Sequence, residues 1–167
     1  MVLGLSLQAF TLLHVIITLV AIASGLIVLF GMLGSHLLGK WTALFLLTTI
    51  LTSVTGFLFP IHGFTPALGV GGVSLLVLLI AVIARYGKHL AGAWRWIYVA
   101  TAVAALWFNV FVLIVQAFEK VPFLHALAPT QSNEPPFVIA QVVALTFFVV
   151  LGLLAAIKFR PGLRLSV

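Results

Sequence analysis

Five long apolar stretches divide this chain of 167 residues, and they constrain its fold more than any other feature. They cover about residues 8–31, 41–60, 66–85, 93–118 and 136–159. A helix needs roughly 20 mainly apolar residues, each rising about 1.5 Å, to cross the hydrocarbon core of a bilayer. Each stretch reaches that length. We therefore predict an all-α fold with one domain over residues 1–167, an integral membrane bundle of five transmembrane helices with an outer loop at residues 119–135.

The composition excludes several classes of protein. Hydrophobic residues make up 64% of the chain and charged residues 6%, whereas a soluble domain carries about 25% charged residues. A soluble enzyme and a disordered tail are therefore excluded. The net charge of +6 is spread too thinly to follow a nucleic-acid backbone, so we expect a lipid bilayer and no nucleic acid as partner. The absence of cysteine excludes disulfides and thiolate metal sites.

The basic residues predict an orientation. Cytoplasmic connections of membrane proteins carry an excess of Lys and Arg. Only Lys120 falls on the face that holds the N-terminus. The opposite face takes the other seven: Lys40, Arg85, Lys88, Arg95, Lys158, Arg160 and Arg164. We predict that the N-terminus lies outside and the C-terminus in the cytoplasm.

Polar side chains inside the apolar stretches form a first group of candidate site residues. Such groups usually face a neighbouring helix, because an unsatisfied polar group costs several kcal/mol in hydrocarbon. They either hold the helices together or line an intramembrane site for a small ligand. The candidates are Thr18, Thr48, Thr52, Asn109, Gln116 and Gln141.

A second candidate site lies at the outer face. Histidines are axial ligands of b-type haem, and imidazole with carboxylate also suits zinc, copper or iron. A histidine at a membrane boundary can equally be an interfacial or structural residue. The sequence therefore allows haem b or quinone here but commits to no cofactor, and it leaves a metal undecided. The candidates for a ligand, haem or metal site are His14, His62, His125, Glu119 and Glu134.

Several motifs resemble those of a group of small bacterial predicted membrane proteins, a domain of unknown function. They lie within residues 10–115 and comprise His14 with Gly25, Gly34–His36 with Gly39–Trp41, Ser53–Phe57, Gly63–Pro66 and Ala84–Tyr86. The loop at 129–136 and the last helix resemble a narrower subgroup. The resemblance implies a bacterial inner membrane and no mechanism.

No nucleophile–base pair stands out in the sequence, so we do not expect an enzyme. We expect an accessory or structural subunit, or an assembly partner, of a larger membrane complex, which would associate with other membrane subunits or with itself. Two alternatives stay open: a redox bundle that binds b-type haem or quinone, and a small transporter or channel. The proline-rich loop at 129–136 is either a surface linker or a docking element.

Overall fold

The computed structural model describes residues 2–60, 66–131 and 133–161. These ranges hold no β-strand, only an isolated bridge between Val2 and Leu5. Among the described residues, five helices are long and apolar enough to cross a membrane: α1, α2, α3 continued into η1, α4 and α6. The prediction of an all-α, multi-pass membrane fold is thereby confirmed. The elements are α1 (Leu7–Leu33), α2 (Gly39–Phe57), α3 (Pro66–Val82), the π-helix η1 (Ile83–Gly87), α4 (Trp94–Lys120), α5 (Pro122–Leu127) and α6 (Pro135–Lys158).

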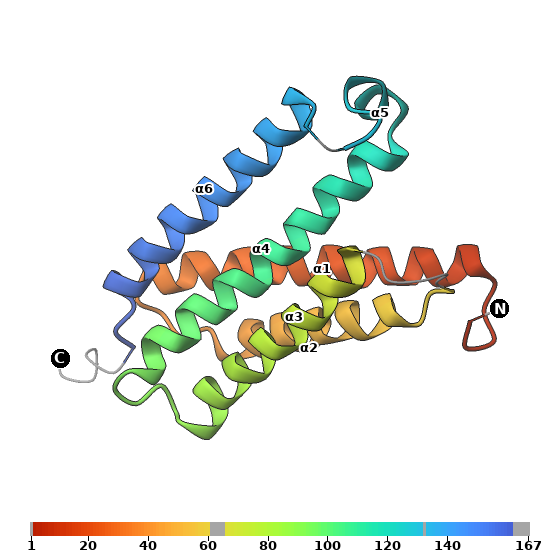
Figure 1. Ribbon diagram of the computed structural model, residues 1–167. Coiled ribbons are helices and arrows are strands. Elements are labelled where there is room, and N and C mark those ends of the chain that lie inside the picture. Colours follow the sequence, from red (N-terminus) through yellow and green to blue (C-terminus); the bar gives the residue numbers. More distant parts are fainter. Residues whose placement is uncertain (1, 61–65, 132, 162–167) are drawn as a thin grey trace.

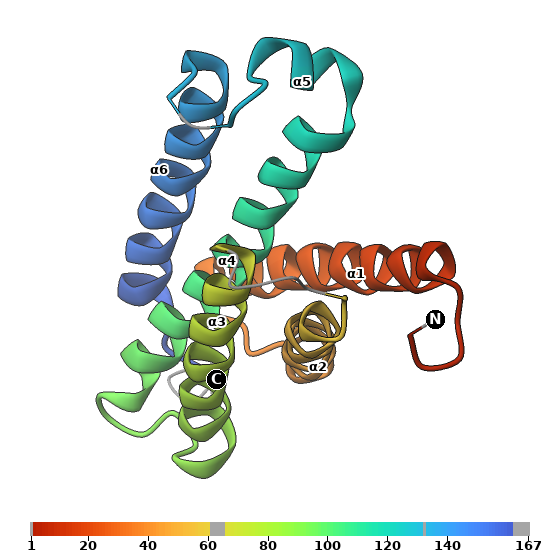
Figure 2. The ribbon, with the colours of Figure 1, turned by 45° about the vertical axis from the view of Figure 1, so that its right-hand side comes forward.

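The long helices form two arms that share one base (Figures 1 and 2). The first arm is the hairpin of α1 and α2, which pack extensively against each other. The second arm consists of α4 and α6, with α5 at its tip, and α3 packs against α2 and α4. α1 lies across α4 and α6 instead of running alongside them (Figure 2). The N-terminus and α5 therefore lie at the tips of different arms.

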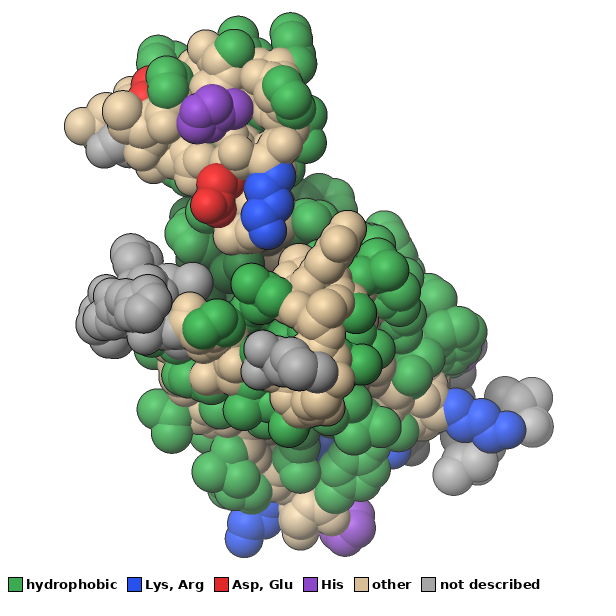
Figure 3. Space-filling model, turned by 90° about the vertical axis from the view of Figure 1, so that its right-hand side faces the viewer, with side chains coloured by type: hydrophobic (Ala, Val, Ile, Leu, Met, Phe, Trp, Pro, Cys, Tyr) green, Lys and Arg blue, Asp and Glu red, His purple; other side chains and the backbone are tan. Residues whose placement is uncertain are grey.

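The buried core lies at the shared base. It takes side chains from the second half of α1, the first half of α2, the end of α3 and the first half of α4, while α6 adds Phe148 and Ala155. Away from the base, much of the surface of the two arms is exposed. The exposed side chains there are mostly apolar. Figure 3 shows hydrophobic side chains spread over much of one face, with few charged side chains: some lie just below the upper lobe and others at the right and lower edges. Core residues of α1 to α4 include Val28, Leu29, Met32, Phe45, Leu46, Leu78, Ala81, Tyr98, Val99, Ala102 and Leu106.

Three connections meet at the base: residues 34–38 between α1 and α2, residues 88–93 between η1 and α4, and residues 159–161 after α6. The backbone N–H of Arg160 donates to Ser35 Oγ at 2.9 Å, and the Arg95 guanidinium donates to the carbonyl of Phe159. We call this region the basic end. Which side of a membrane it faces stays a prediction, and Arg164 lies outside the described residues. The described basic residues at this end are Lys40, Arg85, Lys88, Arg95, Lys158 and Arg160.

The third helix differs locally from the sequence prediction. The third helix is regular only to Val82, because Lys88 donates its backbone N–H to the carbonyl of Ile83, five residues back, at 2.8 Å, which makes η1 a π-helix. At the start of α6, Glu134 occupies the N-cap position without a side-chain capping bond; its carboxylate accepts the backbone N–H of Thr130 at 2.9 Å.

Candidate functional site

His14 is held between the two helices of the hairpin arm. Its Nδ1 lies 2.7 Å from Thr55 Oγ1, and the same hydroxyl lies 2.7 Å from the carbonyl of Leu51. A threonine hydroxyl has one proton to donate, and the carbonyl can only accept it. Thr55 therefore accepts from His14, which assigns the ring proton to Nδ1 and leaves Nε2 as an acceptor.

The surroundings of His14 extend this contact into a polar strip along the α1–α2 interface. The hydroxyl of Thr18 donates to the backbone carbonyl of His14 at 2.8 Å and lies 3.4 Å from the hydroxyl of Thr52. The ring of Phe59 packs edge-on against the imidazole, with centroids 5.3 Å apart. The half-buried histidine thus contacts one hydroxyl and one aromatic ring, and its hydrogen bond to Thr55 joins the two helices.

Replacing Thr55 by valine tests the strip. The change keeps the side-chain shape but removes the acceptor for His14 Nδ1, so the free energy of unfolding should fall by about 0.5–1.7 kcal/mol, the range for hydrogen bonds between membrane helices. Thr11→Val is the matched control, because the hydroxyl of Thr11 donates to the carbonyl of Leu7 in its own helix. Thermal unfolding in detergent measures both variants, and equal losses would contradict an interhelical bond.

The other outer-face candidates are distributed over separate places. His125 is exposed on α5, at the tip of the second arm, away from the hairpin arm that carries His14 (Figure 1). Glu119 accepts a hydrogen bond from Gln116 Nε2 at 3.1 Å, whereas Glu134 is bonded to Thr130. His62 lies outside the described residues.

No three His, Asp or Glu side chains within the described ranges form a group that could hold a metal ion. His14 Nε2 has the chemistry of a ligand atom, since a metal-binding histidine usually donates its other ring N–H to a neighbour. The haem, quinone or metal site at the outer face stays a prediction.

Four of the six intramembrane candidates lie at three different helix interfaces. Thr18 and Thr52 face each other between α1 and α2, as described above. Asn109 Nδ2 donates to Thr49 Oγ1 at 3.3 Å between α4 and α2, and Gln141 Nε2 donates to the carbonyl of Phe111 at 3.3 Å between α6 and α4. The remaining two bond within their own helices: Thr48 with Leu44 at 2.7 Å, and Gln116 with Glu119.

The centre of the base is closely packed. The space between Gly25, Phe45, Ala102 and Leu106 has no volume that a water molecule could occupy. The intramembrane polar side chains contribute to separate helix contacts, and a ligand site among them stays a prediction.

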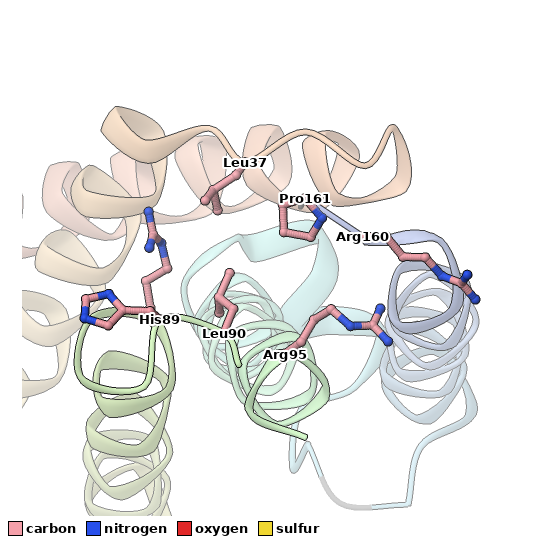
Figure 4. Close-up of a pocket in the computed structure, with 7 residues that line it drawn as sticks. Leu37, His89, Leu90, Arg95, Arg160 and Pro161 are labelled. Carbon is pink, nitrogen blue, oxygen red and sulfur yellow. The ribbon is translucent and has the colours of Figure 1, made fainter. Parts of the chain in front are cut away.

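The sequence analysis missed a pocket at the basic end. It has a volume of about 520 Å³ and is lined by Arg85, Arg95 and Arg160, with His89 and Leu90 from the connection before α4 (Figure 4). Counting Lys and Arg placed these residues on one face. It could not show that three connections fold together and bring three arginines to one pocket.

No family model, curated protein or solved structure matches this chain.

Proposed function

We propose that this multi-pass membrane protein is a non-enzymatic accessory or structural component of a larger membrane complex in a bacterial inner membrane. One observation carries the proposal: several polar side chains inside its long helices bond across helix interfaces. His14, Asn109 and Gln141 each bond across a helix interface, and Ser53 and Ser74 lie 3.4 Å apart between α2 and α3.

This use of polar groups suits a scaffold. Hydrogen bonds between membrane helices fix rotation and register, because lipid offers no hydrophobic force to drive the helices together. The core at the base holds the two arms, while the arms themselves present apolar surface over most of their length. The resemblance to small bacterial membrane proteins supports the bacterial location, and the charge distribution supports an N-terminus outside and a cytoplasmic C-terminus.

Association in the native membrane tests this function. The chain has no cysteine, so a single cysteine can be placed by Val143→Cys on α6, or by Leu76→Cys on α3 as a second position. Both positions are exposed, at 63% and 64%. Crosslinking in native membranes should yield a product larger than one chain from at least one position, because a component of a complex has neighbours within reach. Purification in mild detergent should give a particle heavier than one 17.9 kDa chain with its detergent.

A solitary chain in both measurements would contradict the accessory role. Crosslinking that depends on the position of the cysteine separates a defined neighbour from random collision. Products of equal yield from α3 and α6, rising with expression level, would also count against it.

A further inference from the structure

The pocket at the basic end concentrates positive charge that no acidic side chain of the protein neutralises. The chain has two acidic residues, Glu119 and Glu134. Both lie at the α5 end, where they bond to Gln116 and Thr130. Arg85, Arg95 and Arg160 line one pocket, and none of them pairs with a carboxylate within the described part of the chain. Like charges gathered in this way repel each other unless an anion lies between them.

Arg95 is positioned by the end of α6. Its Nη1 donates to the carbonyl of Phe159, and to that of Ala156 at 3.3 Å, two of the carbonyls that a helix leaves unpaired at its C-terminus. The guanidinium also lies over the ring of Trp96, 4.9 Å from its centroid. These contacts fix the group while Nε and Nη2 remain as donors, because an arginine has five N–H groups.

Arg85 adds a second guanidinium whose hydrogen-bonding capacity is incomplete. Its Nε is buried and has no hydrogen-bond partner among the described residues. The guanidinium carbon lies 5.1 Å from the centroid of the Tyr86 ring. A buried charged donor without a partner is costly, so a ligand that accepts hydrogen bonds near it would be stabilised.

The backbone around the pocket is held in an unusual conformation. His89 and Leu90 are consecutive residues with positive φ, 48° and 60°, and Ser35 has φ 58°. Residues other than glycine rarely adopt this region, at a cost of order 1–3 kcal/mol each, and such residues cluster at ligand sites. Leu90 is buried, and Ser35 accepts the backbone N–H of Arg160, so packing and hydrogen bonding hold the three connections in place.

We propose that this pocket binds a phosphate ester, as found in the headgroup of an anionic membrane lipid. Arginine suits this ligand because its planar fork matches two phosphate oxygens. Leu37, Leu90 and Pro161 supply an apolar lining beside the arginines, which suits an ester with a carbon backbone. Trp94 and Trp96 lie close by, and aromatic side chains of this kind favour the headgroup level of a membrane. Basic pockets between membrane helices recognise lipid headgroups in this way.

Binding to the delipidated full-length protein in neutral detergent tests the proposal. The probes are dioctanoyl phosphatidylglycerol, dioctanoyl phosphatidylcholine, glycerol 3-phosphate and inorganic phosphate, each titrated with native mass spectrometry and thermal unfolding as readouts. Phosphatidylglycerol should bind and raise the unfolding temperature, and phosphatidylcholine should bind at least tenfold more weakly. Arg160→Gln and Arg85→Gln should each weaken phosphatidylglycerol binding about tenfold, as expected for one lost charge-assisted hydrogen bond.

Lys40→Gln is the matched control, since Lys40 is an exposed cation at the same end that does not line the pocket. It should change the affinity less than threefold. The side chain of Arg160 is exposed, so this variant keeps the fold and gives a result even where Arg85→Gln fails to fold.

The source of the phosphate follows from the small probes. Binding of phosphatidylglycerol alone identifies a lipid headgroup, whereas equal binding of glycerol 3-phosphate or inorganic phosphate at the same arginines identifies a free phosphate ligand. Equal binding of the two lipids, or equal losses in Arg160→Gln and Lys40→Gln, would overturn the proposal. The outcome of these binding titrations does not depend on the proposed accessory role, because that role is tested separately by cysteine crosslinking.

Discussion

Replacing Gly25 by alanine should lower the free energy of unfolding by about 1–3 kcal/mol, the usual cost of overfilling a packed core. Gly25 lies in α1 where that helix meets α2 and α4. A Cβ atom at this position would lie 2.6 Å from Leu106 Cδ1 and 2.8 Å from Phe45 Cε2. Leu106 and Phe45 are both fully buried, at 1% exposure each, so neither side chain has free space to move into. Gly25→Val should therefore cost more than Gly25→Ala.

Thermal unfolding in detergent, followed by the loss of the monodisperse peak, measures this effect. Gly72→Ala in α3 is the matched control, because a Cβ there meets no atom within 4 Å. That variant should be neutral or more stable, since alanine favours a helix over glycine by about 0.5–1 kcal/mol. If Gly25→Ala is as stable as Gly72→Ala, the close contact of α1 with α2 and α4 is wrong.

Length and hydropathy were enough to predict the helices, because a membrane span needs a run of apolar residues that few other structures need. They could not predict where the core would lie. Most positions of each stretch are apolar, so the sequence gives little indication of which of the apolar side chains are buried. In α2, Leu46 and Leu47 are chemically identical neighbours, yet Leu46 is 3% exposed and Leu47 57%. Rotation and crossing are set by close contacts such as the one at Gly25.

The polar residues in the sequence indicated some members of the candidate site. His14 and Thr18 are four residues apart, a spacing that puts them on one face of α1, and both contact α2. Their partners depend on how α2 is rotated. Thr52 and Thr55 face α1, whereas Thr49 bonds to Asn109 of α4.

The basic pocket could not be predicted from spacing at all. The whole of α4, α5 and α6 lies between Arg85 and Arg160 in the sequence. The two residues line one pocket because Arg95 of α4 and Ser35 of the α1–α2 connection hold the segment after α6 in place. The sequence carries one signal that points to this pocket: two acidic residues against eight basic ones leave most cations without a partner within the protein. That imbalance indicates an external anion but gives no position.

Leu46→Ala should destabilise the protein by about 2 kcal/mol, while Leu47→Ala should leave its stability within about 0.5 kcal/mol of the original. In soluble cores a leucine-to-alanine change costs about 2–5 kcal/mol, from lost transfer free energy and from the cavity left behind. Lipid solvates a leucine as well as a protein core does, so the transfer contribution largely disappears in a membrane. The remaining loss at Leu46 comes from its packing contacts in the core at the base.

Reversible unfolding in mixed micelles measures the free energy of unfolding of both variants and of the original protein. The two variants make the same leucine-to-alanine change at adjacent residues, so only the surroundings of the side chain differ. Lipid or detergent replaces the removed atoms at Leu47 in both the folded and the unfolded state, so nothing is left to lose there. Equal destabilisation at the two positions would mean that protein covers α2 on both sides, which would contradict the exposed position of Leu47. Equal tolerance would mean that the base is loosely packed. A loss confined to Leu46 is the result that a tightly packed base and lipid-facing arms require.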